Sequence, residues 1–268
     1  MSGPALPKPR PRLADVRLVV RQVRYEQLSF WLNPIGAIFT VGFSLLFLVM
    51  LSASAGSSHV SYLHNVKLVQ YYVPGFIAYG VMSASFNTLA ISLVIRRETG
   101  LLKRLRLSPL PTWTLLTSIL LSTMLIAFAQ VVLMLAVGRW AFGVRLPSGA
   151  GVVALLAVLV LGALSFAALG IAMSTLIPNQ QAAGPLTSTV FFVLLFLSGL
   201  WFPLKSGSTL AKISTWFPIR HFITAVFKTF SHPGTSAWAG HDLLIVAIWG
   251  AVGAAIALRR FRWAPYRT

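Results

Sequence analysis

The residues best suited to specific chemistry lie in the stretch 96–109, which reads Arg-Arg-Glu-Thr-Gly-Leu-Leu-Lys-Arg-Leu-Arg-Leu-Ser-Pro. It places Glu98, one of only four acidic residues in the chain, among basic residues and leucines. Gly100 can end a helix, and the leucines after it recur at helical spacing. A short amphipathic helix with such an edge can dock into a groove on a partner protein. A plain basic loop at a membrane surface is the alternative. The candidate docking residues are Arg97, Glu98, Gly100, Leu101, Leu102, Arg104 and Leu105.

The other ionisable side chains do not form a catalytic or metal-binding set. No Asp, Glu or His lies in the central part of a long apolar segment, which removes most acid–base schemes for an intramembrane protease or transferase. The five histidines all fall outside these segments and are interpreted as surface or interfacial residues, so no metal site is predicted. The chain has no cysteine and no G-x-x-x-x-G-K-S/T loop for phosphates. We therefore expect no cofactor on this chain and no ATP hydrolysis by it.

Six long apolar segments must position these residues. They lie near 32–52, 72–95, 112–138, 151–177, 186–203 and 242–258. About 20 apolar residues span the roughly 30 Å hydrocarbon core of a membrane as a helix. Polar residues do not interrupt the segments at helical or strand period, and only 10% of the chain is charged. The sequence predicts an all-α integral membrane protein with six transmembrane helices.

The basic residues fall mainly in alternate gaps between these segments. One side of the membrane receives 15 Lys and Arg residues and the other receives seven. The positive-inside rule then places both termini in the cytoplasm. The net charge is +18, and we expect the basic residues to be attracted to anionic lipid of the inner leaflet. We expect no nucleic-acid partner.

The pattern before the first span predicts an interfacial helix. In residues 13–29 an apolar stripe is bordered by Arg17, Arg21 and Arg24, whose guanidinium groups suit headgroup phosphates. This helix either anchors the chain only or also contacts a cytoplasmic partner. The predicted organisation is a disordered basic Pro-rich tail (1–12), the interfacial helix (13–29), a six-span domain (30–258) and a basic cytoplasmic tail (259–268).

The gap before the sixth span predicts two short outer helices. Apolar and aromatic residues recur at helical spacing on both sides of Pro218, after a first break at Pro203. The helices either lie in the outer interface or dip back into the membrane. In the simpler alternative the aromatic residues, Trp216 among them, form an interfacial belt.

A few polar and aromatic residues inside the spans are candidates for a substrate path. In the second span they are Ser83, Phe86 and Asn87, and in the fifth they are Ser188, Phe191 and Phe192. Asn87 is expected to face the path because an amide is unusual inside a span. Helix packing through small and hydroxyl residues is the alternative for each of them, as it is for Gly162 and Gly170 in the fourth span.

Together these features resemble the membrane subunit of type-2 ABC exporters, in which six spans associate with a separate ATPase. The likeness rests on the helix before the first span, on residues 97–100 with Ser108-Pro109, and on two Pro-containing stretches, 198–203 and 216–221. Within that family the chain most resembles bacterial permeases that export drugs and natural products.

The resemblance implies a bacterial inner-membrane protein that forms a homodimer or heterodimer of permease chains. It implies an ATPase partner that binds ATP and Mg, docked on the 96–109 stretch and on the interfacial helix. The implied substrate is a hydrophobic or amphipathic compound, such as a drug, a lipid or a lipid-linked glycan. An ion-coupled secondary transporter or a channel is the alternative, although such transporters usually carry ionisable or broken-helix sites near the midplane.

Overall fold

The computed structural model describes residues 12–55, 59–60, 66–102, 112–201, 209–231 and 238–260, so the predicted tails lie largely outside the described residues. The described chain is helical apart from one antiparallel ladder of two short strands, β1 (His59–Val60) and β2 (Val66–Lys67). The helices, with η marking π-helical segments, are α1 (Arg12–Trp31), α2 (Pro34–Ala37), η1 (Ile38–Gly42), α3 (Phe43–Ala55), α4 (Leu68–Met82), η3 (Ser83–Thr88), α5 (Leu89–Glu98), α7 (Thr112–Phe142), α8 (Ala150–Leu176), α9 (Gln180–Leu197), α10 (Thr209–Ser214), α11 (Pro218–Ser231) and α12 (Gly240–Arg260).

Six helical segments of the described chain are long and apolar enough to span a membrane, which confirms the predicted fold class. They are Pro34–Ser54, Leu68–Glu98, Thr114–Phe142, Ala150–Leu176, Gln180–Leu197 and Gly240–Arg260. The fifth begins before the predicted residue 186 because the Asn179 side chain accepts a hydrogen bond from the Ala182 amide at 2.9 Å and caps the helix. It ends near Gly199, whose φ of +79° favours glycine.

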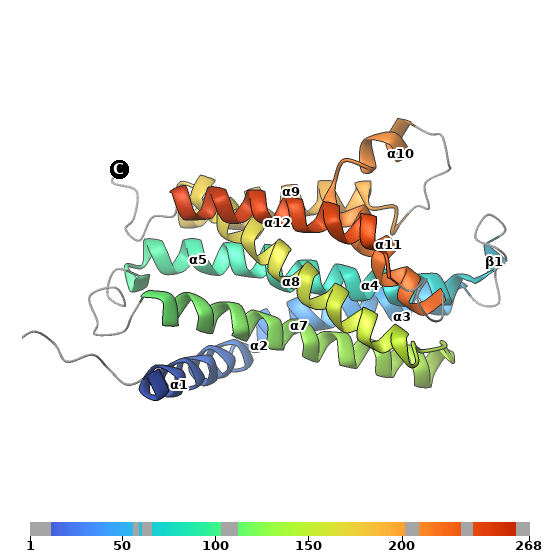
Figure 1. The fold of residues 1–268 in the computed structure, drawn as a ribbon, viewed down its shortest axis with the longest axis horizontal. Helices are drawn as coiled ribbons and strands as arrows, with labels where there is room; N and C mark the ends of the chain where they lie inside the picture. The colour runs from blue at the N-terminus through green and yellow to red at the C-terminus, as the bar shows by residue number, and fades with distance from the viewer. Residues whose placement is uncertain are drawn as a thin grey trace, which may run out of the picture.

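The second span, made of α4, η3 and α5, forms the centre of the bundle. In its most apolar stretch 78% of the residues are buried, against 28% in the first span and 22% in the fifth. It contacts α3, α7, α8, α9 and α11, and Figure 1 shows it running through the middle of the molecule. Residues that project from this span therefore meet most of the other helices.

The first two spans each contain a π-helical segment, and these segments meet. The hydroxyl oxygens of Thr40 in η1 and Thr88 in η3 are 3.5 Å apart. The Thr40 carbonyl also accepts a hydrogen bond from Gln130 Nε2 of α7 at 3.1 Å. Short π-helical segments often occur at functional sites. The meeting point of η1 and η3 is therefore a candidate functional site.

Small residues on α8 let neighbouring helices approach closely. A Cβ added at Gly170 would lie 2.9 Å from the carbonyl oxygens of Ser85 and Phe86, so η3 packs directly on the α8 backbone. A Cβ added at Gly162 would overlap the ring of Phe222 of α11. The packing interpretation of both glycines is thus confirmed.

The two short helices predicted around Pro218 are present, and α11 begins at that proline. Proline suits the first position of a helix because its missing N–H would have no helical partner there. Ile219, Phe222 and Val226 of α11 are fully buried, and the helix packs against α4, α8 and α12. α11 therefore packs on the spans, and its depth in the membrane stays a prediction.

α1 lies against α7 and turns its apolar stripe outward. Val19 is buried, and Gln27 Nε2 donates to the carbonyl and the hydroxyl of Ser122 at 2.8 and 2.9 Å. Val16 and Val20, both in the predicted stripe, are 58% and 63% exposed. The polar side of the helix therefore faces the protein, and the apolar side is available to a membrane surface.

Candidate functional site

The end of α5 joins neighbouring helices through two adjacent arginines. Arg96 reaches α1, where its two terminal nitrogens donate to the Glu26 carboxylate at 2.7 and 2.5 Å. Its Nε donates to the Ser92 hydroxyl at 3.1 Å. The bidentate geometry fixes the orientation of both charged side chains, which are only 20% and 10% exposed. Glu26 and Arg96 are far apart in the sequence, so residue spacing does not indicate that they pair, and sequence reasoning missed this contact.

Arg97 turns the other way and holds the end of α8. Its Nη1 and Nη2 donate to the carbonyl oxygens of Ser174 and Ile177 at 3.0 and 2.6 Å, and its Nε donates to Glu98 at 3.0 Å. Carbonyls at a helix C-terminus lack intrahelical partners, and a cation there is stabilising. The side chain is buried. Arg97, one of the candidate docking residues, therefore clamps the second span to the fourth from a buried position.

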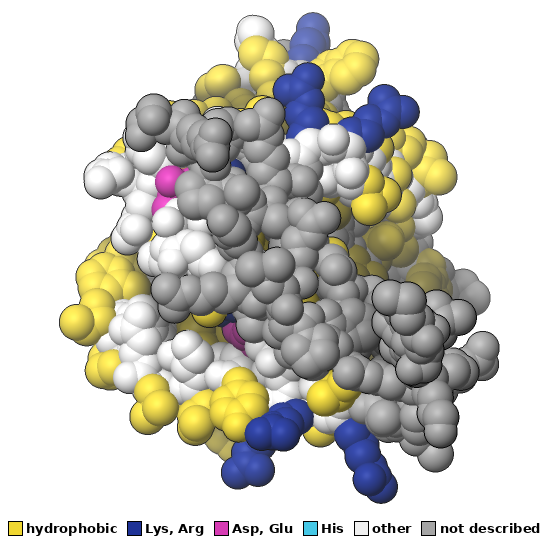
Figure 2. All heavy atoms as spheres, turned by 90° about the vertical axis from the view of Figure 1, so that its left-hand side faces the viewer, with side chains coloured by type: hydrophobic (Ala, Val, Ile, Leu, Met, Phe, Trp, Pro, Cys, Tyr) yellow, Lys and Arg dark blue, Asp and Glu magenta, His cyan; other side chains and the backbone are white. Residues whose placement is uncertain are grey.

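α5 ends in a turn that exposes one leucine and buries the next. Gly100 has a φ of +71°, which explains the glycine at this helix end. Leu101 is 41% exposed, whereas Leu102 packs in a buried cluster with leucines of α5 and α7. The remaining candidates Arg104 and Leu105 lie outside the described residues. Figure 2 looks onto this end of the molecule, where basic side chains stand at the edge and acidic ones lie further in.

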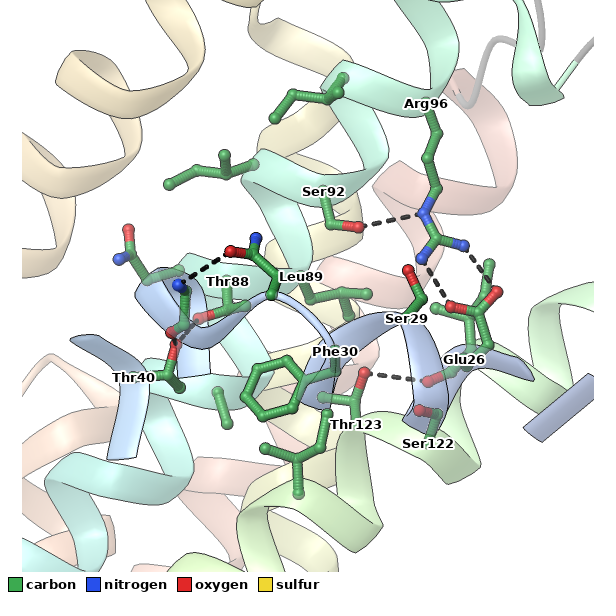
Figure 3. A pocket seen from close by; sticks show the side chains of 18 of the residues that line it. Glu26, Ser29, Phe30, Thr40, Thr88, Leu89, Ser92, Arg96, Ser122 and Thr123 are labelled. Atoms are coloured by element: carbon green, nitrogen blue, oxygen red, sulfur yellow. Dashed lines mark hydrogen bonds and ion pairs between the residues drawn. The ribbon is translucent and has the colours of Figure 1, made fainter. Parts of the chain in front are cut away.

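A cavity of about 830 Å³, here named the α1–α5 pocket, opens beside this junction. It lies between α1, the first two spans and α7. Figure 3 shows Arg96 and Glu26 facing each other at one end, Phe30 in the middle and Thr40 with Thr88 at the other end. Phe30 thus lies between the Arg96–Glu26 pair, which has Ser29, Ser92 and Ser122 beside it, and the two threonines. The volume is in the range of small-molecule sites, roughly 300–1,000 Å³.

Two amide side chains lie near the Thr40–Thr88 end, one half-buried and one fully buried. Asn87 lines the pocket, and its Oδ1 has no partner among the described residues. Gln130 of α7 is fully buried, and its Nε2 donates to the Thr40 carbonyl at 3.1 Å and to the Ser44 hydroxyl at 2.6 Å. Gln130 joins the first and third spans. Sequence reasoning missed it, although its position inside the predicted segment 112–138 was a sufficient signal.

Residues 57–259 match the protein family described as ABC-2 family transporter protein. The match extends from before the second span almost to the end of the sixth. The chain belongs to this family. The inferred resemblance is therefore confirmed, and with it the interpretation as a permease subunit, a class that lacks an ATPase domain.

Two bacterial relatives of this permease are distant in sequence. YbhR of Escherichia coli strain K12, named as a multidrug ABC transporter permease, is 28% identical over 159 residues, or 59% of this chain. That alignment spans 43% of YbhR, less than half its length. YvfS of Bacillus subtilis strain 168, named as a transport permease, is 27% identical over 177 residues, which is 65% of this chain and 71% of YvfS.

In this permease the predicted path residues of the second span lie in different surroundings. Ser83 and Phe86 are buried in η3, which packs against α8. Asn87 instead lines the α1–α5 pocket. Ser83 and Phe86 therefore pack between helices in the single chain, and a place for them and for Asn87 on the path stays a prediction.

The predicted path residues of the fifth span lie on different sides of α9. Phe191 is buried against Tyr79 of α4, with 5.4 Å between ring centroids. Phe192 is exposed, and Ser188 is half-buried. None of the three lines the α1–α5 pocket. A path that uses both spans thus needs a surface beyond this pocket.

The three predicted interfacial arginines of the permease are exposed on α1, away from the pocket. They are Arg17, Arg21 and Arg24. The guanidinium of Arg21 lies 5.8 Å from the ring centroid of Tyr25, and its hydrogen bond and charge lower the pKa of that tyrosine. These groups form a basic outer face on the helix, in the pattern expected next to phosphate headgroups.

At the α10–α11 end of the permease, Trp216 is 77% exposed just before Pro218, while Pro203 lies outside the described residues. The placement of Trp216 at the membrane interface stays a prediction. The interpretation of every histidine as a surface or interfacial residue is wrong for His221. That side chain is buried and contacts Asp242, a neighbour which residue spacing alone could not reveal.

Proposed function

We propose that this permease is the membrane-spanning subunit of an ATP-driven exporter, working as a dimer with a separate ATPase that binds ATP and Mg. Family membership supports the ATPase and the second permease copy, identical or not. The observation that carries the proposal is the junction at the end of α5, where Arg96 and Arg97 fasten α5 to α1 and α8. A rigid junction at the end of the bundle can pass a partner's movement to the spans.

The docking surface is divided between contact residues and supporting residues. Leu101, which is exposed, and Glu98, which is half-buried and paired with Arg97, meet the ATPase at the end of α5, together with Arg104 and Leu105. Arg97, Gly100 and Leu102 hold the shape of that surface from inside. A partner contact made through a few apolar anchors with charges at the rim is typical of such interfaces.

The α1–α5 pocket suits an uncharged amphipathic compound. Its charged residues Glu26 and Arg96 neutralise each other, so neither requires a charged ligand. Asn87 lines the pocket, and its buried, unpartnered Oδ1 can accept a hydrogen bond from a hydroxyl or amide of the ligand once the side chain rotates toward it. The name of YbhR, a multidrug permease, supports a drug-like substrate, and lipids or lipid-linked glycans share the same chemistry. Ser188 and Phe192 on α9 would belong to the path in the dimer.

In this proposal the permease lies in a bacterial cytoplasmic membrane. Both termini and the end of α5 face the cytoplasm, following the excess of basic residues on that side. Arg17, Arg21 and Arg24 then contact anionic headgroups, while the exposed apolar stripe of α1 enters the interface.

The deciding experiment is purification of the tagged full chain from its native membrane, followed by mass spectrometry and an ATPase assay. We expect a P-loop ATPase at near one-to-one ratio, and we expect Leu105→Asp to release it while the permease still reaches the membrane. A second assay follows ATP-driven movement of a fluorescent amphipathic dye in proteoliposomes. A preparation that carries no ATPase would contradict the proposal and favour an ion-coupled transporter or a channel.

A further inference from the structure

A cluster of charged side chains fastens α11 to α12 at the α10–α11 end of the bundle. His221 of α11 and Asp242 at the start of α12 are both buried, with His221 Nδ1 2.7 Å from Asp242 Oδ1. Lys228, further along α11, donates from Nζ to Asp242 Oδ2 at 2.7 Å. The proposed coupling junction and pocket do not use any of these residues.

The same histidine also holds the turn between α10 and α11. Its Nε2 lies 2.8 Å from the carbonyl oxygen of Thr215. The neighbouring Arg220 donates to the Ala211 carbonyl at 2.6 Å and also to the Ser214 hydroxyl. Two side chains from the first turn of α11 therefore bind oxygens at and just beyond the end of α10. Of the two side-chain types, only histidine has a neutral form in proteins.

The two contacts of the His221 ring require two N–H groups. The Thr215 carbonyl oxygen only accepts hydrogen bonds, and so does the Asp242 carboxylate that is paired with the Lys228 ammonium. A neutral imidazole has one N–H, whereas an imidazolium has two. Both contacts are satisfied together only when His221 is protonated.

We propose that His221 is a pH-operated clip between the α10–α11 turn and α12. In the protonated form the ring bridges Thr215 and Asp242. When the proton leaves, the remaining N–H stays with the charged carboxylate, the stronger acceptor, and Nε2 presents a lone pair to the Thr215 oxygen. Two acceptors repel each other, so the turn is released. The clip is closed at low pH, where the ring holds both protons, and it opens as the pH rises and one proton leaves.

The charged groups around the ring come from the two helices that pack against each other there. Asp242 and His241 face it from α12, with 5.8 Å between the two histidine ring centroids, and Lys228 and Arg220 lie on α11. The side chain of His241 is exposed. Arg220 keeps its charge throughout and holds α10 in place when the clip opens.

The part that moves is the turn around Trp216. Trp249 of α12 also holds this turn, because its Nε1 donates to the Trp216 carbonyl at 3.0 Å. Loss of the His221 contact therefore makes the turn more mobile without detaching it. The side chain of Trp216 is 77% exposed, which makes it a suitable reporter position.

Metal binding is the competing use of the same cluster. His221, His241 and Asp242 each bring one ligand atom within 4.8 Å of the others. Lys228 and the Thr215 carbonyl already engage the Asp242 and His221 atoms, so a cation would have to displace protein partners. The clip needs no such displacement, and an experiment can distinguish the clip from metal binding.

The test uses a spin label at a single Trp216→Cys substitution in the full chain, held in lipid nanodiscs. The natural chain has no cysteine, so the label is unique. Between about pH 5 and pH 9 we expect the ratio of mobile to immobile label to rise roughly tenfold, because one charge-assisted hydrogen bond is lost. In His221→Gln the label should be mobile at both pH values. The control His241→Gln should keep the transition, since no bond from His241 to the turn is part of the clip.

Three results would overturn the clip. They are a label whose mobility is the same at both pH values, a pH change that survives His221→Gln, and an immobile state that forms only with added zinc and disappears with a chelator. The pH profile of the labelled parent decides the question even if His221→Gln does not fold. The readout involves neither ATP nor transport, so failure here leaves the proposed function standing.

Discussion

At the scale of single residues, two neighbours of the same type make different contacts. Arg96 and Arg97 point in different directions because successive helical residues are about 100° apart. One pairs with Glu26 of α1 and the other holds carbonyls at the end of α8. A substitution at either position therefore loosens a different joint, and neither is replaceable by a generic positive charge.

The Arg96–Glu26 pair should contribute to stability as a unit. We expect Glu26→Gln and Arg96→Gln each to lower the free energy of unfolding by about 1–3 kcal/mol, because each leaves a partly buried charge without its partner. The double variant should lose less than the sum of the two, which denaturant titrations in detergent can measure. Arg24→Gln, at an exposed position, is the control and should stay within about 0.5 kcal/mol. Strict additivity would show that the pair is not coupled.

Gly80 should not tolerate a methyl group, although it lies in a helix. An added Cβ would lie 2.7 Å from Gln130 Nε2, and moving that amide would break its bonds to Thr40 and Ser44. We expect Gly80→Ala to cost about 1–3 kcal/mol. Gly184→Ala is the matched control, since nothing lies within 4 Å of its Cβ position, and it should stabilise by about 0.4–1 kcal/mol. Equal melting temperatures for the two variants would contradict the argument.

At the scale of elements, the sequence predicted what depends on local pattern and missed what depends on distant partners. The spans and the break at Pro218 follow from apolar length and from proline geometry. The Arg96–Glu26 and His221–Asp242 contacts do not, because one sequence contains no signal for which helices lie side by side. Burial at the end of α5 was missed for the same reason. Leu101 and Leu102 are the same residue type, and their exposure differs because α7 covers Leu102 and not Leu101.

That difference predicts two distinct outcomes for one substitution. Leu101→Asp should leave folding intact and reduce the ATPase activity that copurifies with the permease roughly tenfold or more, as loss of an interface anchor does. Leu102→Asp should prevent stable folding, because it buries a carboxylate among leucines. Size-exclusion profiles and ATPase assays on both purified variants provide the measurement. Normal ATPase recovery with Leu101→Asp would remove the exposed leucine from the docking surface.

At the scale of the whole molecule, the two ends of the bundle differ in kind. The α5 end combines the charged junction, the α1–α5 pocket and the basic face of α1. The opposite end carries α10, α11 and the buried His221–Asp242 contact (Figure 1). Most basic residues of the chain belong to the first end by the count of alternate gaps. Anionic inner-leaflet lipid should therefore set the orientation, with the α5 end in the cytoplasm.

The orientation can be tested directly because the chain has no cysteine of its own. Single cysteines at Leu210 of α10, 56% exposed, and at Thr99, exposed at the end of α5, sample the two ends. In intact cells a membrane-impermeant maleimide should label Leu210→Cys at once and Thr99→Cys only after permeabilisation. The cysteine-free parent is the control for background. The reverse pattern would mean that charge does not orient this permease as the positive-inside rule requires, and it would place the docking surface on the side of the membrane where no ATP is available.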